Sequence, residues 1–490
     1  MPITSVHADY ASYSPQWKAC RDLAAGEYAI KDAGETYLPK MSGISDAEYL
    51  AYKARACLFG AFGRTVDGLM GMVARKVPER EISGGLTSLL DSVDNAGTAL
   101  DEFALNAVRD IITVGRGGFL VEYPTIPDGT TVGEVERNKL RPHASYYHAE
   151  SIVDWRTQRV GNAEILTMVK LRETIARPSA NDPWVVEAVT QYRVLELAGG
   201  VYSQSLFVQS GKTSEKSSEY VLKWSIVPQL GGVPFREIPF VFVGTVQVSK
   251  PPLIDLATLN IAHYRNSADY ENGLHWTGVP TPVFIGSFAD MGPDGGEVHD
   301  VTLGATAGIH LLEGGSAHFL EFNGTGLEGN LGKAMDRKAD MMATLGARML
   351  ETEKKTAESY DTVSIRRQGE MSVLAAIANN VSRAIQKMLS WMDVFYGNTG
   401  RYVYWLNTDY LPKAIDGNMV REVVAAWQAG AFSTEEMFEV FRAGEMVRSD
   451  KTVEDHDAEV MNDSVRVGIM AKAQALLAPK KVDTGQAAQV

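Results

Sequence analysis

The chain has 490 residues, of which 45% are hydrophobic and 22% are charged, which is usual for a folded soluble protein. Its formal net charge is −14, so it is a poor candidate for a protein that wraps nucleic acid tightly, because that binding depends on basic side chains that neutralise phosphates. Roughly two to four domains are expected at this length. No apolar run approaches the length of a bilayer span, and the N-terminus lacks the basic start and apolar core of a signal peptide. We therefore expect a cytosol-like compartment, in which Cys20 and Cys57 stay reduced.

The N-terminal part is predicted to be mainly helical. Apolar residues recur every three or four positions over residues 47–76, which predicts one helix that Pro78 ends. A second helical region is predicted over residues 86–115. Residues 115–124 then read as a glycine-rich turn that feeds a short strand. Because these glycines precede a strand and do not open a helix, no helix N-terminus is available there to hold a phosphate.

Residues 145–250 are predicted to be rich in β-structure. Four segments are enriched in Val, Ile, Thr and Tyr and are separated by Gly, Pro and Ser, namely residues 163–172, 185–197, 220–227 and 240–246. The polar residues 209–218 read as a hairpin loop. They include Gly211-Lys212-Thr213, which is similar to the end of a phosphate-binding loop, but that motif requires a glycine where this chain has Leu206.

Pro251 and Pro252 mark a sharp boundary and open a helix predicted over residues 253–276. A compact β segment follows, with strands predicted at 283–285, 308–312 and 318–322. Two further helices are predicted between residues 326 and 396, because each carries apolar residues three or four positions apart. The polar break between them, residues 351–358, reads as a projecting loop, and its Lys354 and Lys355 are candidates for contact with an acidic partner.

A strand is predicted at residues 401–406, followed by short helices that start at Asp416 and at the capping sequence 433–436. The tail after Leu477 is predicted to be disordered because its apolar pattern is weak.

Catalytic and metal-binding signatures are absent from the sequence. It has no nucleophile elbow, no zinc-binding His-Glu-x-x-His helix and no paired Cys-x-x-Cys motifs. His143, His148 and Glu150 form the only cluster with metal-like spacing, and on a β-rich stretch we expect them to be structural. No catalytic residue, metal or cofactor is therefore expected. The alternative is a hydrolase that uses His148, Glu150 and Asp154, brought together only by folding.

The order of these segments resembles the portal (head–tail connector) proteins of tailed bacteriophages. Residues 251–264 resemble the start of that family's stem helix, and residues 115–124 and 146–155 resemble its wing. Residues 355–359, followed by a long helix, resemble its tunnel region. The resemblance covers about residues 10–450 and consists of a pattern of segments, without a catalytic signature.

The resemblance implies an α+β, multi-domain portal fold of wing, stem, clip and crown with a long spine helix. The implied parts are a wing at 1–251 (a helical N-terminus plus a β-rich body), a first stem helix at 252–276, a clip at 277–325, a second stem helix at 326–350, a tunnel loop at 351–362, a spine helix and wing return strand at 363–412, a crown at 413–477 and a disordered tail at 478–490.

The implied function is that of a ring-shaped, dodecameric channel at the capsid vertex for packaging, retaining and ejecting DNA. Lys354 and Lys355 of the tunnel loop would contact double-stranded DNA without sequence preference. The implied partners are the terminase large subunit, then a head–tail adaptor protein, and the major capsid and scaffolding proteins, with no membrane and no catalysis by this chain. The location would be the virion, after assembly in the host bacterial cytoplasm. Another oligomeric virion scaffold, such as a capsid or tail component, is the remaining alternative.

Overall fold

The structure is a computed structural model that describes residues 2–124, 130–138, 140–179, 182, 184–210, 219–230, 232–278, 281–285, 314–320, 326–346, 360–410, 417–444, 446–447 and 451–462. The chain divides into two compact units, Met1–Thr408 and Asp409–Val490. Helices occur together with antiparallel sheets, which confirms the predicted α+β class. No helix in the described part combines the length and apolar character needed to cross a bilayer. Both cysteines are free, Cys20 buried and Cys57 exposed.

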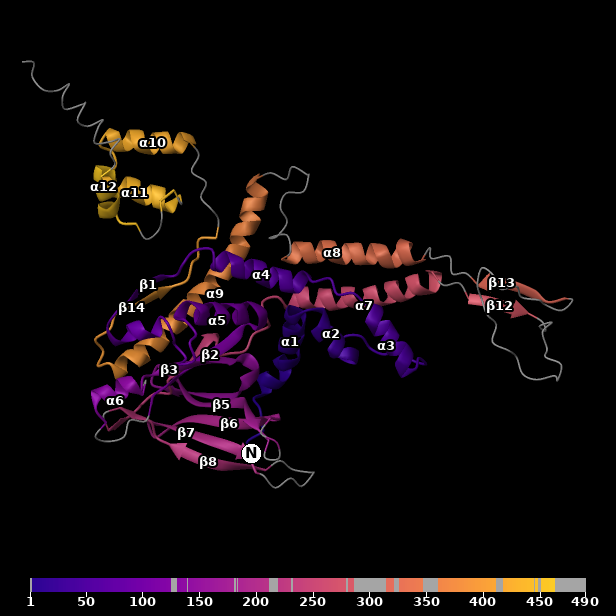
Figure 1. The fold of residues 1–490 in the computed structure, drawn as a ribbon, viewed down its shortest axis with the longest axis horizontal. Coiled ribbons are helices and arrows are strands. Elements are labelled where there is room, and N and C mark those ends of the chain that lie inside the picture. The colour runs from indigo at the N-terminus through magenta and orange to yellow at the C-terminus, as the bar shows by residue number, and fades with distance from the viewer. Residues whose placement is uncertain are drawn as a thin grey trace, which may run out of the picture. The chain divides into compact units, whose positions relative to one another are not determined.

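Helices form the N-terminal part of the first unit (Figure 1). They are α1 (Ala8–Ala25), α2 (Glu27–Asp32), α3 (Asp46–Arg55), α4 (Ala61–Val73) and α5 (Leu100–Val114), with short 3-10 turns at Gly34–Thr36 and Gly84–Leu89. The small helix α6 (Val132–Arg137) lies further along the chain. Helix α1 packs against α4 and α5, which places its buried face, including Trp17, in the core of the unit.

The single helix predicted over residues 47–76 is wrong, because the chain leaves the helical conformation between α3 and α4. The Cys57 N–H donates to Ser267 Oγ at 3.1 Å, and the Leu58 N–H donates to the Glu27 carboxylate at 3.3 Å. Ser267 belongs to α7 (Ile254–Gly278) and also donates its hydroxyl to the Cys57 carbonyl at 2.7 Å. Backbone groups that a continuous helix would pair internally are thus paired with two other helices.

The helical region predicted over residues 86–115 is also shorter than expected, since α5 begins only at Leu100. A turn precedes it, in which the Asp94 carboxylate accepts the Ala96 N–H at 2.8 Å and the Thr98 N–H at 3.1 Å. An Asp side chain that bonds backbone groups two and four residues ahead favours a turn over a helix.

Two antiparallel sheets form the β-rich body of the first unit. The three-stranded sheet has the order β11-β2-β3, with β2 at Arg116–Glu122, β3 at His143–His148 and β11 at Phe240–Gly244. The five-stranded sheet is a meander of β4 (Ile152–Val160), β5 (Ala163–Pro178), β6 (Val186–Ala198), β7 (Val201–Gln209) and β8 (Tyr220–Ile226). The four predicted strand segments are confirmed, while β3, β4 and β7 were not predicted. One hydrophobic core joins α1 to both sheets through Trp17, Tyr202 and Phe240.

Smaller strand pairs complete the first unit. Strand β1 (Glu79–Ile82) pairs with β14 (Tyr402–Trp405), so the predicted strand at 401–406 is confirmed and its partner is now known. Strand β9 (Gln229–Leu230) pairs with β10 (Val233–Pro234). Ser210 N–H donates to the Glu219 carbonyl at 2.8 Å and joins the ends of β7 and β8. Most of the predicted loop at 209–218 lies outside the described residues.

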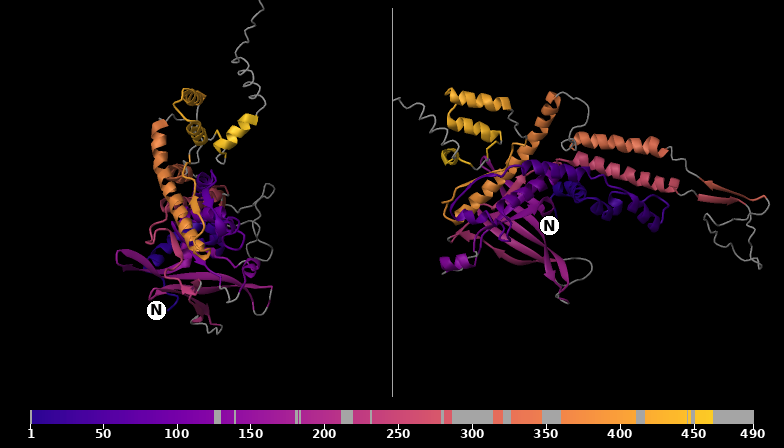
Figure 2. Two further views of the ribbon diagram at one scale, coloured as in Figure 1. Left: turned by 90° about the vertical axis from the view of Figure 1, so that its left-hand side faces the viewer. Right: turned by 45° about the horizontal axis from the view of Figure 1, so that its top comes forward.

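Residues 254–345 contain a pair of helices, α7 and α8, and a pair of strands, β12 and β13, beyond one end of the helices. Helix α7 lies beside α8 (Lys333–Leu345), which a π-helical turn at Leu327–Gly332 precedes, and strands β12 (Thr281–Ile285) and β13 (Ser316–Leu320) lie beyond the same end of both helices (Figures 1 and 2). The strands are antiparallel, with Thr281 opposite Leu320. The predicted helix over 253–276 is confirmed. The predicted strand at 308–312 lies outside the described residues, as does the end of the one at 318–322.

Helix α9 (Tyr360–Phe395) is the longest helix of the described chain and confirms the predicted long helix. Its apolar stripe packs against α5, β2, β11 and β14, and Val381, Ile385 and Met388 are fully buried. The predicted stripe of the preceding helix is less buried, because Met342 is covered but Leu345 is exposed and Met349 lies outside the described residues.

The second unit contains α10 (Gly417–Gln428), α11 (Thr434–Ala443) and α12 (Val453–Asn462). The predicted capping sequence is confirmed at α11: the Glu436 N–H donates to Ser433 Oγ at 3.1 Å, and the Ser433 N–H donates to the Glu436 carboxylate at 2.7 Å. The predicted start at Asp416 and the tail after Leu477 lie outside the described residues.

Candidate functional site

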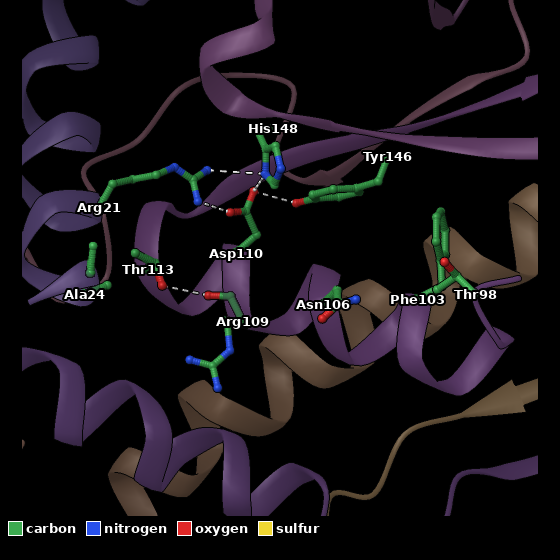
Figure 3. A pocket seen from close by; sticks show the side chains of 11 residues that line it. Arg21, Ala24, Thr98, Phe103, Asn106, Arg109, Asp110, Thr113, Tyr146 and His148 are labelled. Atoms are coloured by element: carbon green, nitrogen blue, oxygen red, sulfur yellow. Dashed lines mark hydrogen bonds and ion pairs between the residues drawn. The ribbon is translucent and has the colours of Figure 1, made fainter. Parts of the chain in front are cut away.

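An open pocket of about 540 Å³ lies between α1, α5 and β3 (Figure 3). Helix α1 contributes Arg21, β3 contributes Tyr146 and His148, and α5 contributes Asp110, together with the residues Phe103, Asn106, Arg109 and Thr113. Figure 3 shows Arg21, Tyr146 and His148 converging on the Asp110 carboxylate, while the Arg109 side chain points away from it. The pocket therefore has one strongly polar wall, centred on Asp110.

Asp110 is the hub of this wall and is only 3% exposed. Arg21 Nη1 donates to its Oδ1, the Tyr146 hydroxyl donates to its Oδ2 at 2.7 Å, and His148 Nδ1 lies 3.1 Å from Oδ2. Arg21 also holds Glu150 in a bidentate contact, with Nε to Oε1 at 2.6 Å and Nη2 to Oε2 at 2.9 Å. The Arg21 guanidinium thus joins a carboxylate of α5, Asp110, to a carboxylate that follows β3, Glu150. Two parallel N–H···O bonds, as in the contact with Glu150, are the favoured geometry between a guanidinium and a carboxylate.

Electrostatics keep the hub ionised. Burial pushes the pKa of Asp110 upward, but the hydrogen bond from His148 and the charge of Arg21 outweigh burial and hold that pKa below its usual range. The hydrogen bond to Asp110 raises the pKa of His148, although burial opposes it. Burial, followed by the Asp110 charge, raises the pKa of Tyr146 well above its ordinary value. Because the Asp110 carboxylate accepts from three donors, we expect it to stay ionised and to hold α5 against α1 and β3.

Of the three residues of the alternative hydrolase hypothesis, His148 and Glu150 share one cluster, whereas Asp154 has a different partner. His148 and Glu150 both contact Arg21, with His148 Nδ1 at 3.5 Å from Nη2. Asp154 lies on β4, where its Oδ2 is 3.5 Å from Lys170 Nζ. Among the hydrogen bonds and ion pairs of the described residues, none joins Asp154 to His148 or Glu150.

His143 is separated from the pocket and has its own carboxylate. Its Nε2 lies 3.6 Å from Glu122 Oε2, and Glu122 also pairs with Arg193. Burial raises the pKa of Glu122, but the hydrogen bond from His143 and the charge of Arg193 outweigh burial and lower that pKa to about 2. The described residues contain no group of three or more side chains placed to bind a metal ion. His143 and His148 are instead found in separate ion-pair networks.

Sequence reasoning missed Arg21 and Asp110, which organise the pocket. A signal for Asp110 was present, because it interrupts the apolar face that α5 buries with Ala107, Val108 and Ile111. A charged residue at such a position needs a buried partner. The partner of Asp110 is Arg21, which reaches it because α1 packs against α5. No local sequence pattern predicts that packing.

The glycines of the predicted turn have steric roles in β2. A Cβ atom on Gly117 would lie 2.0 Å from the Tyr146 hydroxyl, and one on Gly118 would lie 2.2 Å from Phe240 Cζ. Gly115 ends α5 with φ of +87°, a conformation that favours glycine. Gly117 and Gly118 therefore let aromatic rings of the two neighbouring strands pack across β2. As predicted, a strand follows these glycines and not a helix.

The second candidate region is the pair α7 and α8. One face of α7 is buried and polar: Asn260 Oδ1 accepts the Phe62 N–H at 3.2 Å, and Asn260 Nδ2 donates to the Phe59 carbonyl at 2.8 Å. Further along, Tyr52 donates its hydroxyl to Asp269 at 2.6 Å. These bonds fix α7 to α3 and α4. Lys354 and Lys355, the predicted DNA contacts, lie outside the described residues, between α8 and α9.

Comparison with known proteins adds the following. A family model described as a domain of unknown function (DUF4055) matches residues 252–396, which enclose α7, α8 and α9. No curated protein matches the chain. A solved structure, the neck of an empty GTA particle computed with C6 symmetry, is similar at 15% identity and a TM-score of 0.37, over 81% of this chain and 93% of that chain. A TM-score of this size does not establish a shared fold.

Proposed function

We propose that the chain is the portal protein of a tailed phage or of a related particle, forming a ring-shaped channel through which DNA passes. The supporting observation is the arrangement of the segment from α7 to α9. Helices α7 and α8 lie side by side, strands β12 and β13 extend beyond one end of the pair, and the long helix α9 follows. Such a segment matches the stem, clip and spine that the sequence resemblance implies.

The dimensions of these helices suit a channel wall. Helix α7 has 25 residues and α9 has 36, which correspond to lengths of about 37 Å and 54 Å at the rise of an α-helix. Only the first two thirds of α7 contain its buried residues, which end at Ala268. In the remaining part of α7 and in most of α8 the side chains are partly or fully exposed, and a neighbouring copy would cover them.

Exposed apolar side chains on this pair support assembly. They are Leu274 and Trp276 on α7, and Met341 and Leu345 on α8. The two pairs lie near opposite ends of α7 and α8, because Gly273 lies against Leu327 while Gly346 lies against Thr65 and Leu256. Each pair adds apolar surface that a partner can cover. In a closed ring, one face of each copy binds a different face of its neighbour, and repetition of that contact closes the circle. A neighbouring copy would cover these side chains.

The remaining features of the proposal follow from the resemblance. The ring would be dodecameric, would stand at the capsid vertex, and would bind the terminase large subunit during packaging and a head–tail adaptor afterwards. The chain would have no catalytic activity and no cofactor. Each copy adds a formal charge of −14, and an acidic channel does not hold phosphates tightly. The limits of wing, clip, stem, tunnel loop and crown stay predictions.

Native mass spectrometry and negative-stain microscopy of the purified chain test the proposal. We expect closed rings with a central hole. Trp276→Glu, which places a charge on α7, should shift the population toward single copies, because Trp276 is 60% exposed in one copy and would be buried between two. Trp184→Glu is the matched control: Trp184 is 92% exposed between β5 and β6, away from α7 and α8. Single copies of the unaltered chain at all concentrations would contradict the proposal.

The tunnel-loop hypothesis has its own test. The double variant Lys354→Ala and Lys355→Ala should reduce DNA packaging or retention, because it loses contacts with the phosphate backbone of DNA. Ring formation should stay intact, because these lysines are proposed to contact DNA and not a neighbouring copy. Loss of the ring in this double variant would show that the loop is an assembly element instead.

A further inference from the structure

Helix α7 lies between α3 and α8, which contact different faces of it (Figures 1 and 2). On one face, Arg55 Nη1 of α3 donates to Asn272 Oδ1 at 3.2 Å. On another face, the Tyr270 ring lies against Gly332, where the π-helical turn leads into α8; a Cβ atom on Gly332 would lie 4.0 Å from Tyr270 Cε2. Two residues turn an α-helix by about 200°, so Tyr270 and Asn272 point in nearly opposite directions. The outer faces of α3 and α8 are therefore the two edges of one three-helix layer.

The outer edge formed by α3 is an apolar stripe that begins with a carboxylate. Tyr49 and Tyr52 lie on the inner face of α3 and are buried. The opposite face is exposed and carries apolar residues three and four positions apart, namely Ala47, Leu50 and Ala54. Leu50 is 57% exposed. Asp46, in the first turn, pairs with Lys40 at 2.6 Å, yet its side chain is 96% exposed. Such a face suits a helix that offers both a large apolar side chain and a cation.

The outer edge formed by α8 offers those two groups. Met342 is fully buried on the inner face. On the opposite face the exposed residues are Lys333, Arg337, Asp340, Met341 and Thr344. Among the hydrogen bonds and ion pairs of the described residues, none involves the side chain of Lys333 or Arg337. Arg337 and Met341 are four residues apart, so they lie on neighbouring turns of the same face. A free guanidinium thus stands beside a large apolar side chain that is 47% exposed.

The two edges suit each other in successive copies of a ring. A ring that closes needs one surface of each copy to bind a different surface of the next. The edges lie on opposite sides of α7, and the contacts of Asn272 and Tyr270 place α3 and the start of α8 along the same turn of that helix. A rotation about a ring axis would therefore bring α3 of one copy beside α8 of the next, with no large shift along α7. Their charges are complementary, since Asp46 is acidic and Arg337 is basic.

We propose that the α3 edge of one copy binds the α8 edge of the next copy, with Leu50 against Met341 and the Asp46 carboxylate near the Arg337 guanidinium. The partner is a second copy of this chain, and the inference rests on the proposed ring because it names the two surfaces that close it. Burial of both apolar side chains supplies the attraction. The opposite charges favour this pairing over α3 with α3 or α8 with α8, which would place like charges together.

Cysteine cross-linking of the full-length chain tests the pairing. The parent carries Cys57→Ser, which removes the exposed thiol, while Cys20 stays because it is buried. Leu50→Cys and Met341→Cys are added to this parent separately and together, and a short bismaleimide is applied. A chain with one new cysteine can form only one link, so co-expression of the two single variants should give dimers and no larger species. The double variant should give a ladder of species up to the full ring, and each single variant alone should give no dimer.

Trp184→Cys is the matched control, because Trp184 is 92% exposed but lies between β5 and β6; together with Leu50→Cys it should give no dimer. Charge reversal adds a second readout. Arg337→Glu should raise the chain concentration at which half of the copies are in rings by about two- to fivefold, and Asp46→Lys should reverse most of that change in the double variant. Lys223→Glu on β8 changes the charge equally and should leave this concentration unchanged.

Rings that form without the cross-link between Leu50→Cys and Met341→Cys would overturn this inference and leave the proposed ring standing. A dimer from either single variant alone would also overturn it, because that contact joins identical surfaces. Equal effects of Arg337→Glu and Lys223→Glu on assembly would have the same consequence. Absence of rings from the unaltered chain would instead refute the proposed function, and this inference with it.

Discussion

Replacement of Asp110 by Ala tests the ion-pair cluster of the pocket most directly. The change removes the acceptor shared by Arg21 of α1 and by Tyr146 and His148 of β3. Arg21 would keep its bidentate contact with Glu150, but the Tyr146 hydroxyl would lose the acceptor that the structure gives it. The side-chain contacts that join α5 to α1 and to β3 through Asp110 would then be lost.

The expected loss is large because the carboxylate is buried. Removal of one partner from a buried ion pair costs about 3–5 kcal/mol, and an orphaned buried donor alone costs about 1–3 kcal/mol. We therefore expect Asp110→Ala to lower the free energy of unfolding of the first unit by about 3–5 kcal/mol. Asp67→Ala provides the control, since Asp67 is 66% exposed and also pairs with an arginine. Exposed pairs contribute only about 0.2–1 kcal/mol.

Urea unfolding followed by tryptophan fluorescence measures both variants under the same conditions. The pH dependence adds a second readout. The pKa of Asp110 is lowered in the folded chain, so its contribution is present above the unfolded pKa and is lost as pH falls through the folded value. The pKa of His148 is raised, so its contribution is present below the unfolded pKa and is lost as pH rises through the folded value. Equal losses in Asp110→Ala and Asp67→Ala would refute this reasoning.

Three other outcomes are expected. Gly118→Ala should destabilise the first unit by about 1–3 kcal/mol in urea unfolding, because the new Cβ meets the Phe240 ring; unchanged stability would mean that the ring moves freely. Asn260→Ala should cost about 1–3 kcal/mol, since it leaves the buried backbone N–H of Phe62 unpaired; hydrogen exchange at Phe62 should accelerate. Glu122→Gln should be less stable than the parent at neutral pH, and the two unfolding curves should converge as pH falls toward about 2.

The long elements of the fold could be predicted from local pattern. Helix α9 carries a stripe of apolar residues at helical spacing, and that stripe is the face it buries. Helix α7 is bounded by prolines, which made its limits readable. The capping box at Ser433 and Glu436 is a local signal and was also predicted correctly.

Features that depend on distant partners could not be predicted. The break between α3 and α4 exists because Ser267 and Glu27 offer partners to the backbone at Cys57 and Leu58, and nothing in the local sequence marks these partners. The side-chain contacts of the pocket also depend on residues that are distant in the sequence. His148 and Glu150 were singled out for their spacing, but the arginine that joins them is more than a hundred residues away in the chain.

Electron cryomicroscopy of the purified, full-length chain is the most direct test of the proposed function. We predict a closed ring whose bore is lined by α7 and α8 of successive copies, with Trp276 covered by the adjacent copy. A reconstruction in which α7 and α8 pack within an isolated particle that has no opening wide enough for a DNA duplex would contradict the proposal.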